Sequence, residues 1–192
     1  MWCSKPRAAA TGGTNSWPDA ISVRLPTVAS PIRDPKLPRE RVLVDIPNLG
    51  HDDRVALQEL KARYFRFVDT KDWVGFETLF APDATLAAVD DLPGVVFKGA
   101  SGVREGVAGS MHDVVSVHHG FTPELHMVAP DEAAGIWPME DLLWFGEASS
   151  APGLFLHGFG HYHERYVRVS GEWLFRSIRL HRMRVETRNA VP

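Results

Sequence analysis

The chain has 192 residues, of which 44% are hydrophobic and 23% charged, proportions that are typical of one globular domain. Its formal net charge of −3 does not favour a partner with a phosphate backbone, and its apolar runs are too short to cross a bilayer. The one cysteine, Cys3, excludes a disulfide framework and a cysteine-based zinc site. We therefore expect a cytoplasmic protein that binds neither nucleic acid nor membrane and handles a small molecule.

The first 50 residues differ in composition from the rest. Half of the 14 prolines lie there, together with a Gly-Gly pair and no sustained hydrophobic periodicity. Repeated prolines interrupt both helices and strands. We predict that residues 1–50 form a disordered or loosely packed Pro-rich arm and that residues 51–192 form the folded domain.

Helices are predicted in the first part of this domain. Between Asp52 and Val68 the apolar residues recur at helical spacing, with Asp52 or Asp53 available as the N-cap. A short second helix would follow, capped by Thr70, and residues 85–89 and 95–97 read as a hairpin. Residues 101–111 complete the set as a third helix.

The second part is rich in β-formers. Five segments separated by turns predict strands, and they cover residues 114–121, 124–129, 134–145, 154–169 and 172–185. Several are long enough to require bending, which Gly158 and Gly160 would relieve. The predicted fold is α+β: about three N-terminal helices packed on a strongly curved antiparallel sheet, forming a cone whose open mouth suits a small apolar ligand.

Several segments resemble SnoaL-like proteins of the nuclear-transport-factor-2-like superfamily. The similar segments are residues 62–69, 79–84, 117–124, 135–141 and 158–166, so the resemblance extends over nearly all of residues 52–192. It implies a cone-shaped fold, no cofactor and a homodimer or higher homo-oligomer formed through the outer sheet face. The superfamily includes polyketide cyclases, scytalone dehydratase, bile-acid 7α-dehydratase, ketosteroid isomerase, limonene epoxide hydrolase and members without catalysis.

The resemblance is strongest to the dehydratase branch, whose members carry a Tyr and an Asp five positions apart on the first helix. Tyr64 and Asp69 have this spacing, His118 stands at a strand start, and Asp141 takes the place of a second polar group on the next strand. By this resemblance Asp69 orients His118, which removes a proton next to a carbonyl. Tyr64 would hold the enolate oxygen, and the imidazolium or Asp141 would return a proton to the leaving hydroxyl.

Other interpretations of the same residues stay open from the sequence. Asp69 could cap the second helix or pair with Arg66, and Asp141 could be a proton donor or an ion-pair partner. A slip of one residue in strand register would place His119 in the cone instead of His118. Limonene epoxide hydrolase depends on an Asp–Arg–Asp set, for which the sequence offers no clear arginine.

The predicted function is a cofactor-independent dehydratase or isomerase that acts on an apolar cyclic or polyketide- or steroid-like carbonyl compound by His–Asp acid–base chemistry. The alternative is a non-catalytic module for small-ligand binding or assembly. The side chains that we expect to contact the substrate are Trp137, Met139, His119, Phe121 and Tyr162.

Two further groups of residues were considered. His157, His161 and His163 share strand parity and, with Glu164 or His118, could bind a metal, but the family resemblance implies none and we predict no metal site. The C-terminal strand is basic, and a solvated edge is favoured over a carboxylate- or CoA-binding site or a subunit contact for its arginines, which are Arg176, Arg179, Arg182 and Arg184.

Overall fold

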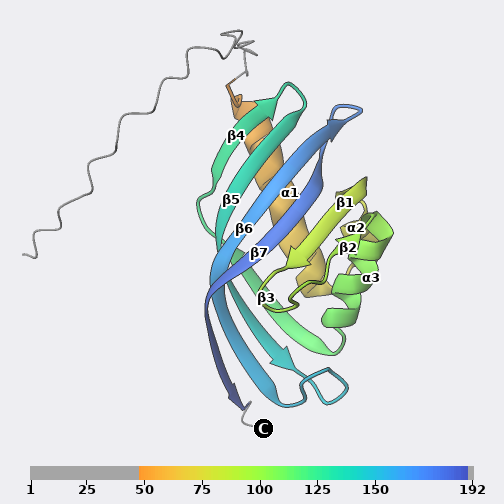
Figure 1. Ribbon diagram of the computed structural model, residues 1–192, viewed down its shortest axis with the longest axis vertical. Coiled ribbons are helices and arrows are strands. Elements are labelled where there is room, and N and C mark those ends of the chain that lie inside the picture. The colour runs from red at the N-terminus through yellow and green to blue at the C-terminus, as the bar shows by residue number, and fades with distance from the viewer. Residues whose placement is uncertain (1–47, 190–192) are drawn as a thin grey trace, which may run out of the picture. The chain divides into compact units, whose positions relative to one another are not determined.

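Three helices pack against one large curved sheet, as predicted (Figure 1). The computed structural model describes residues 48–189, so the predicted arm lies almost wholly outside the described residues. The elements are α1 (His51–Thr70), α2 (Trp73–Glu77), β1 (Phe80–Ala88), β2 (Phe97–Lys98), α3 (Ala100–Ser110), β3 (Val114–Gly120), β4 (Glu124–Ala129), β5 (Glu132–Phe145), β6 (Leu154–Val169) and β7 (Glu172–Asn189). In this part of the chain no helix is long and apolar enough to cross a membrane.

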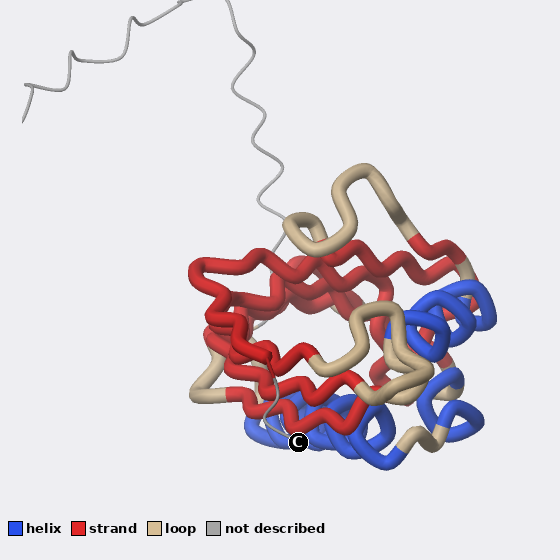
Figure 2. Tube along the Cα trace, turned by 90° about the horizontal axis from the view of Figure 1, so that it is seen from below, coloured by secondary structure: helices blue, strands red, loops and turns tan. Residues whose placement is uncertain are grey.

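The sheet has the order β2-β1-β7-β6-β5-β3, and β4 also pairs with β5. All neighbours are antiparallel except β1 and β7, so the sheet is mixed where we expected an antiparallel one. The parallel pair is possible because β1 and β7 are joined through β2, α3 and the strands β3 to β6 rather than by a hairpin. Figure 2 shows how the strands curl around an interior while the helices lie along the remaining side.

Helix α1 lies against the sheet with an apolar stripe formed by Leu57, Leu60, Tyr64 and Val68, which are all buried. The predicted cap is wrong: the helix begins after Gly50 and no side chain caps it. Asp53 instead accepts hydrogen bonds from Arg168 of β6 at 2.9 Å and from the indole of Trp173 of β7 at 3.0 Å. These bonds connect the first turn of α1 to the sheet, a long-range requirement that local sequence does not reveal.

The start of α2 also differs from the prediction. Asp72, not Thr70, caps this helix, because its side chain accepts a hydrogen bond of 2.9 Å from the amide of Gly75. Thr70 still belongs to α1 and donates its hydroxyl proton to the carbonyl of Arg66. Lys71 and Asp72 lie between the two helices, and Lys71 has a left-handed backbone conformation with φ of 59°.

A buried ion pair holds the middle of α1 against β6. The ammonium of Lys61 lies 2.5 Å from a carboxylate oxygen of Glu164, and both side chains are almost fully buried. The other Glu164 oxygen accepts the hydroxyl proton of Tyr166, which itself accepts a 2.8 Å hydrogen bond from the indole of Trp137. The ammonium also lies 3.5 Å from the centre of the Tyr162 ring. Burial lowers the pKa of Lys61 to about 8, although Glu164 opposes that shift.

Breaking this pair from one side is expected to be costly. Lys61→Met leaves the carboxylate of Glu164 buried without its cation, which should lower the free energy of unfolding by about 3–5 kcal/mol. The double variant Lys61→Met/Glu164→Gln removes both charges and keeps an acceptor for Tyr166, so it should be more stable than the single variant. Urea unfolding measures both. Arg63→Met on the exposed face is the control, with a change of about 0.5 kcal/mol or less. Equal losses of stability for the Lys61 and Arg63 variants would contradict this role of the buried ion pair.

Candidate active site

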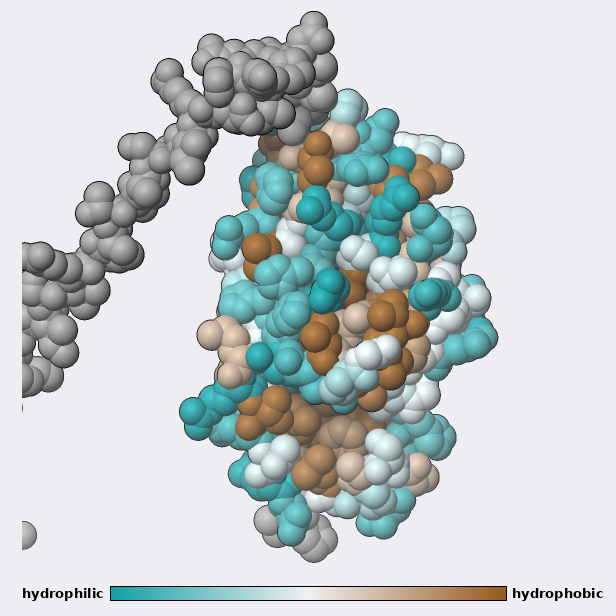
Figure 3. Space-filling view, viewed as in Figure 1, coloured by the Kyte–Doolittle hydropathy of each residue, from teal (hydrophilic) through white to brown (hydrophobic). Residues whose placement is uncertain are grey.

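A cavity of about 730 Å³ lies between the inner face of the sheet, α3 and the loop of residues 89–96. Most of its wall is hydrophobic, including Leu86, Phe97, Val107, Leu143, Leu156 and Leu180. Figure 3 shows hydrophobic side chains gathered around a hollow in the lower half of the face it displays, whereas the upper half is mainly hydrophilic. A cavity of this size and character fits a small, largely apolar ligand.

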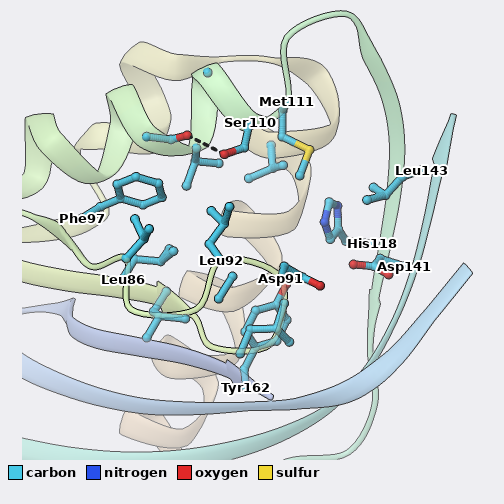
Figure 4. A pocket seen from close by; sticks show the side chains of 18 of the residues that line it. Leu86, Asp91, Leu92, Phe97, Ser110, Met111, His118, Asp141, Leu143 and Tyr162 are labelled. Atoms are coloured by element: carbon cyan, nitrogen blue, oxygen red, sulfur yellow. Dashed lines mark hydrogen bonds between the residues drawn. The ribbon is translucent and has the colours of Figure 1, made fainter. Parts of the chain in front are cut away.

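His118 lines this cavity (Figure 4) and contacts Asp69 of α1. The Nδ1 of His118 lies 2.6 Å from Oδ1 of Asp69, and the backbone amide of His118 donates to Oδ2 at 3.0 Å. An ionised carboxylate only accepts hydrogen bonds, so Nδ1 carries the proton and Nε2 is left with the lone pair. The His118 side chain is 5% exposed. The pair therefore has the tautomer that a general base needs.

Asp69 is held as a carboxylate by its surroundings. Burial by itself raises the pKa of Asp69, but hydrogen bonds from the His118 side chain and backbone and from Ser116 outweigh burial, so the pKa is lowered overall. The two other interpretations of Asp69 do not describe its contacts: Asp72 caps α2, and the guanidinium of Arg66 lies over the ring of Phe67. The contacts of Asp69 are therefore with His118 and Ser116.

Tyr64 and Tyr162 also line the cavity, from α1 and β6 respectively. Their ring centres are 6.0 Å apart, and both side chains are buried. Burial raises the pKa of Tyr64 well above its ordinary value, and the nearby carboxylate of Glu164 raises it further. Burial has the same effect on the pKa of Tyr162. Both phenols consequently stay protonated and can donate a hydrogen bond to a ligand.

Asp141 lies opposite His118 in the pairing of β3 with β5, and it forms an ion pair with Arg182. The guanidinium Nη1 donates to Oδ1 of Asp141 at 2.8 Å, while Nη2 lies 3.1 Å from the carboxylate of Asp91. Of the two roles considered for Asp141, its contacts are those of an ion-pair partner. Gly158 leaves room for this pair, because a Cβ there would come within 2.3 Å of Arg182 and 2.4 Å of Asp141.

Arg182 is the site residue that sequence reasoning missed. We assigned it to a solvated edge, yet its side chain is 8% exposed and lines the cavity. Arg182 follows Ile178 and Leu180 at alternating positions of β7, in regular register with β6, so its side chain faces the cavity as theirs do. The register shifts only after Arg182, between its pairing with Gly160 and the pairing of Arg184 with Phe159. The alternation of Ile178, Leu180 and Arg182 was the available signal in the sequence.

Four of the five expected substrate contacts do not line the cavity; only Tyr162 does. Trp137 and Met139 lie on the inner face of β5 but nearer the start of the strand than Asp141, where core side chains fill the interior. The side chain of His119 alternates to the outer face and lies 3.4 Å from Glu140. Phe121 follows the end of β3 and is 53% exposed.

Two of the three histidines of β6 have local contacts. His157 forms a 2.6 Å contact with Glu140, and His163 packs edge-on against His181. Between residues 48 and 189 no three His, Cys, Asp or Glu side chains are grouped to hold a metal ion.

The SnoaL-like domain family matches residues 51–179, which is most of the chain. The chain belongs to this family. It is 29% identical over 135 residues to a Gibberella zeae protein named probable cyclase FGR4, an alignment that includes 66% of this chain and 89% of the relative. This SnoaL-like chain thus has a sequence relative whose name refers to cyclase activity.

Solved structures of low sequence identity share the fold. Hexachlorocyclohexane dehydrochlorinase LinA-type3 of Novosphingobium barchaimii superposes with a TM-score of 0.62 at 19% identity, covering 73% of this chain and 92% of the other. A Novosphingobium aromaticivorans protein provisionally named scytalone dehydratase gives 0.61 at 18% identity, covering 73% and 93%. At these identities the likeness establishes the cone fold and nothing about the reaction.

Gly158→Ala tests whether the Arg182–Asp141 pair requires the space that a glycine at position 158 leaves. The added methyl group should displace both partners and lower the free energy of unfolding by about 1–3 kcal/mol, as overpacking does. Gly102→Ala in α3 is the matched control, because nothing lies within 4 Å of its added Cβ and alanine favours a helix. Urea unfolding of both variants decides, and an unchanged stability of Gly158→Ala would show that the site yields without cost.

Proposed function

We propose that this SnoaL-like protein is a cofactor-independent dehydratase or isomerase acting on an apolar cyclic or polyketide- or steroid-like carbonyl compound. The observation that carries the proposal is the contact of 2.6 Å between His118 and Asp69 at the wall of an apolar cavity. Removal of a proton next to a carbonyl needs a positioned base, a donor for the enolate oxygen and a pocket that excludes water.

In the dehydration, Nε2 of His118 takes the proton on the carbon next to the carbonyl, and the electron pair of that bond moves to the carbonyl oxygen. Tyr64, protonated and at the cavity wall, donates a hydrogen bond to the developing enolate oxygen. The enolate then re-forms the carbonyl and expels the β-hydroxyl, which receives the proton from the imidazolium and leaves as water. Asp69 stabilises the imidazolium between the two steps.

The names of similar proteins agree with this chemistry at a coarse level. A sequence relative is named a cyclase, and structural neighbours are named dehydrochlorinase and scytalone dehydratase. Dehydrochlorination and dehydration both remove a proton from one carbon and a leaving group from its neighbour. The names of these proteins therefore support an enzyme of lyase or isomerase kind. The proposal of a specific reaction is based on the residues of this cavity.

The charges around the cavity favour an uncharged substrate. Arg182 is shared by Asp91 and Asp141, so these three side chains together carry one negative charge. Glu105 of α3 adds another carboxylate to the cavity wall. Among the described residues that line the cavity, no cation besides the shared Arg182 and the imidazole of His118 is present to receive a carboxylate, and a further negative charge placed there is repelled in a poorly hydrated site. We therefore assign a neutral carbonyl compound rather than its free acid.

A second candidate function is favoured by one observation. Arg182 flanked by Asp91 and Asp141 is an Asp–Arg–Asp set of the kind on which limonene epoxide hydrolase depends, and the sequence alone did not reveal it. In that reaction a carboxylate would activate a water against an epoxide carbon. His118 would then have no essential role, which makes the two candidates separable.

Adjacent histidines provide a matched test of the proposed base. His118→Gln should lower kcat/KM for dehydration of cyclic β-hydroxy ketones by roughly 100-fold or more, because the base is lost. His119→Gln on the outer face should leave it within about twofold. The enone product is followed by its ultraviolet absorbance. Epoxide turnover that requires Asp141 but not His118 would instead support the second candidate, and ligand binding without any turnover would support a non-catalytic binding module.

Substrate charge can be varied without altering the protein. For one β-hydroxy carbonyl compound carrying a remote carboxyl group, the methyl ester should have a kcat/KM about 10-fold or more above that of the free acid at pH 8. Asp91→Asn removes one negative charge from the wall and should narrow that ratio. A preference of the wild-type protein for the acid would contradict the assignment of a neutral substrate.

The cytoplasmic location and the homo-oligomer implied by the family stay predictions. The outer sheet face does expose apolar side chains, among them Val115, Val117 and Trp144. Such side chains are compatible with a second copy of the chain on that face. We retain the homodimer as part of the proposal.

A further inference from the structure

Lys71 occupies a backbone conformation that does not suit a lysine. It terminates α1 with φ of 59° and ψ of 28°, the left-handed region that helix ends usually fill with glycine because a side chain is strained there. The turn directs the Lys71 side chain toward β3, where its ammonium donates to the hydroxyl of Ser116 at 3.0 Å. A lysine in this strained backbone region suggests that its side chain has a role.

The hydroxyl of Ser116 connects Lys71 to the proposed catalytic pair. Ser116 is buried, and its Oγ lies 2.9 Å from Oδ1 of Asp69, the same oxygen that contacts Nδ1 of His118. An ammonium has no acceptor, so the lone pair of the Ser116 oxygen receives the Lys71 proton and the hydroxyl hydrogen is free to be given to Asp69. The order of donation is thus fixed from Lys71 through Ser116 to Asp69.

We propose that Lys71 and Ser116 are positioning residues that offset part of the negative charge of Asp69 and so keep His118 neutral, the form that accepts a proton. A carboxylate beside an imidazole favours the imidazolium, which is useless as a base. A hydrogen bond and a cation on the far side of the same carboxylate reduce that effect while keeping the carboxylate in place. The inference rests on the proposed role of His118, but its test reads the imidazole itself.

The other groups around His118 act from the cavity side. They are Tyr64 of α1, Asp141 of β5 with its partner Arg182 of β7, Tyr162 of β6, Asp91 of the 89–96 loop and Glu105 of α3. The uncharged ring of Phe65 lies nearly parallel to the imidazole of His118, with 6.0 Å between the ring centres. Asp69 and Lys71 instead face a separate hollow of about 380 Å³. The charge of Lys71 can therefore be removed without altering the lining of the ligand cavity.

The experiment follows the His118 ring protons by NMR across pH in the full-length protein. In Lys71→Met and in Ser116→Ala the midpoint of the His118 titration should move upward by about 0.5–1 pH unit, because Asp69 is less offset. A purely structural role predicts the opposite sign, since a loosened Asp69 would stabilise the imidazolium less. A downward or unchanged midpoint overturns the inference.

Three further variants make the result specific. Lys71→Arg retains a cationic donor and should restore the midpoint, whereas Lys98→Met, which removes an exposed lysine of β2, should not move it. Lys71→Gly suits the left-handed backbone and should unfold at an equal or higher temperature, yet still move the midpoint upward. If turnover exists, the acid limb of kcat/KM moves with the midpoint; if no substrate is turned over, the titration still decides this inference independently of the proposed reaction.

Discussion

The buried contact between Lys61 and Glu164 is the interaction on which the position of α1 depends. Burying two charges is favourable only when they meet each other and when their remaining bonding capacity is used. Here Tyr166 and the face of Tyr162 complete the set. The contact fixes how α1 is rotated and how far it slides along the sheet. Tyr64 lies one turn after Lys61, so the same contact places the phenol at the cavity wall.

The inner face of β5 shows how the fold separates stability from the site. Toward the start of the strand this face carries Ala133 and Trp137, which pack in the core under α1. Toward its end the same face carries Asp141 and Leu143, which line the cavity. One alternating strand therefore passes from a filled interior to a hollow one. The polar groups of the site lie at this boundary, where the filled side holds them in place and the hollow side gives them access to a ligand.

How far the sequence predicts the molecule follows from the range of the interactions involved. The helices, most strand bounds and the meeting of Asp69 with His118 follow from periodicity and from the family resemblance. The predicted cap of α1 was wrong because Asp53 is used by Arg168 and Trp173, which are distant in sequence, and that of α2 because Thr70 still belongs to α1. Arg182 was missed because the arginines of the last strand were grouped by charge, whereas regular alternation places Arg182 on the same inner face as Ile178 and Leu180.

Neighbours of equal chemistry can therefore differ completely in environment. His118 and His119 are adjacent, yet the buried ring of His118 contacts the partly buried carboxylate of Asp69 and lines the cavity, whereas the half-exposed ring of His119 contacts Glu140. The acidic groups on the two sides of His118 have different partners: Asp69 has His118 and Ser116, while Asp141 has Arg182, which it shares with Asp91. Because the Asp141 pair is already satisfied, it does not compete for the imidazole. This allocation of partners leaves an imidazole oriented by Asp69 at the wall of an apolar cavity.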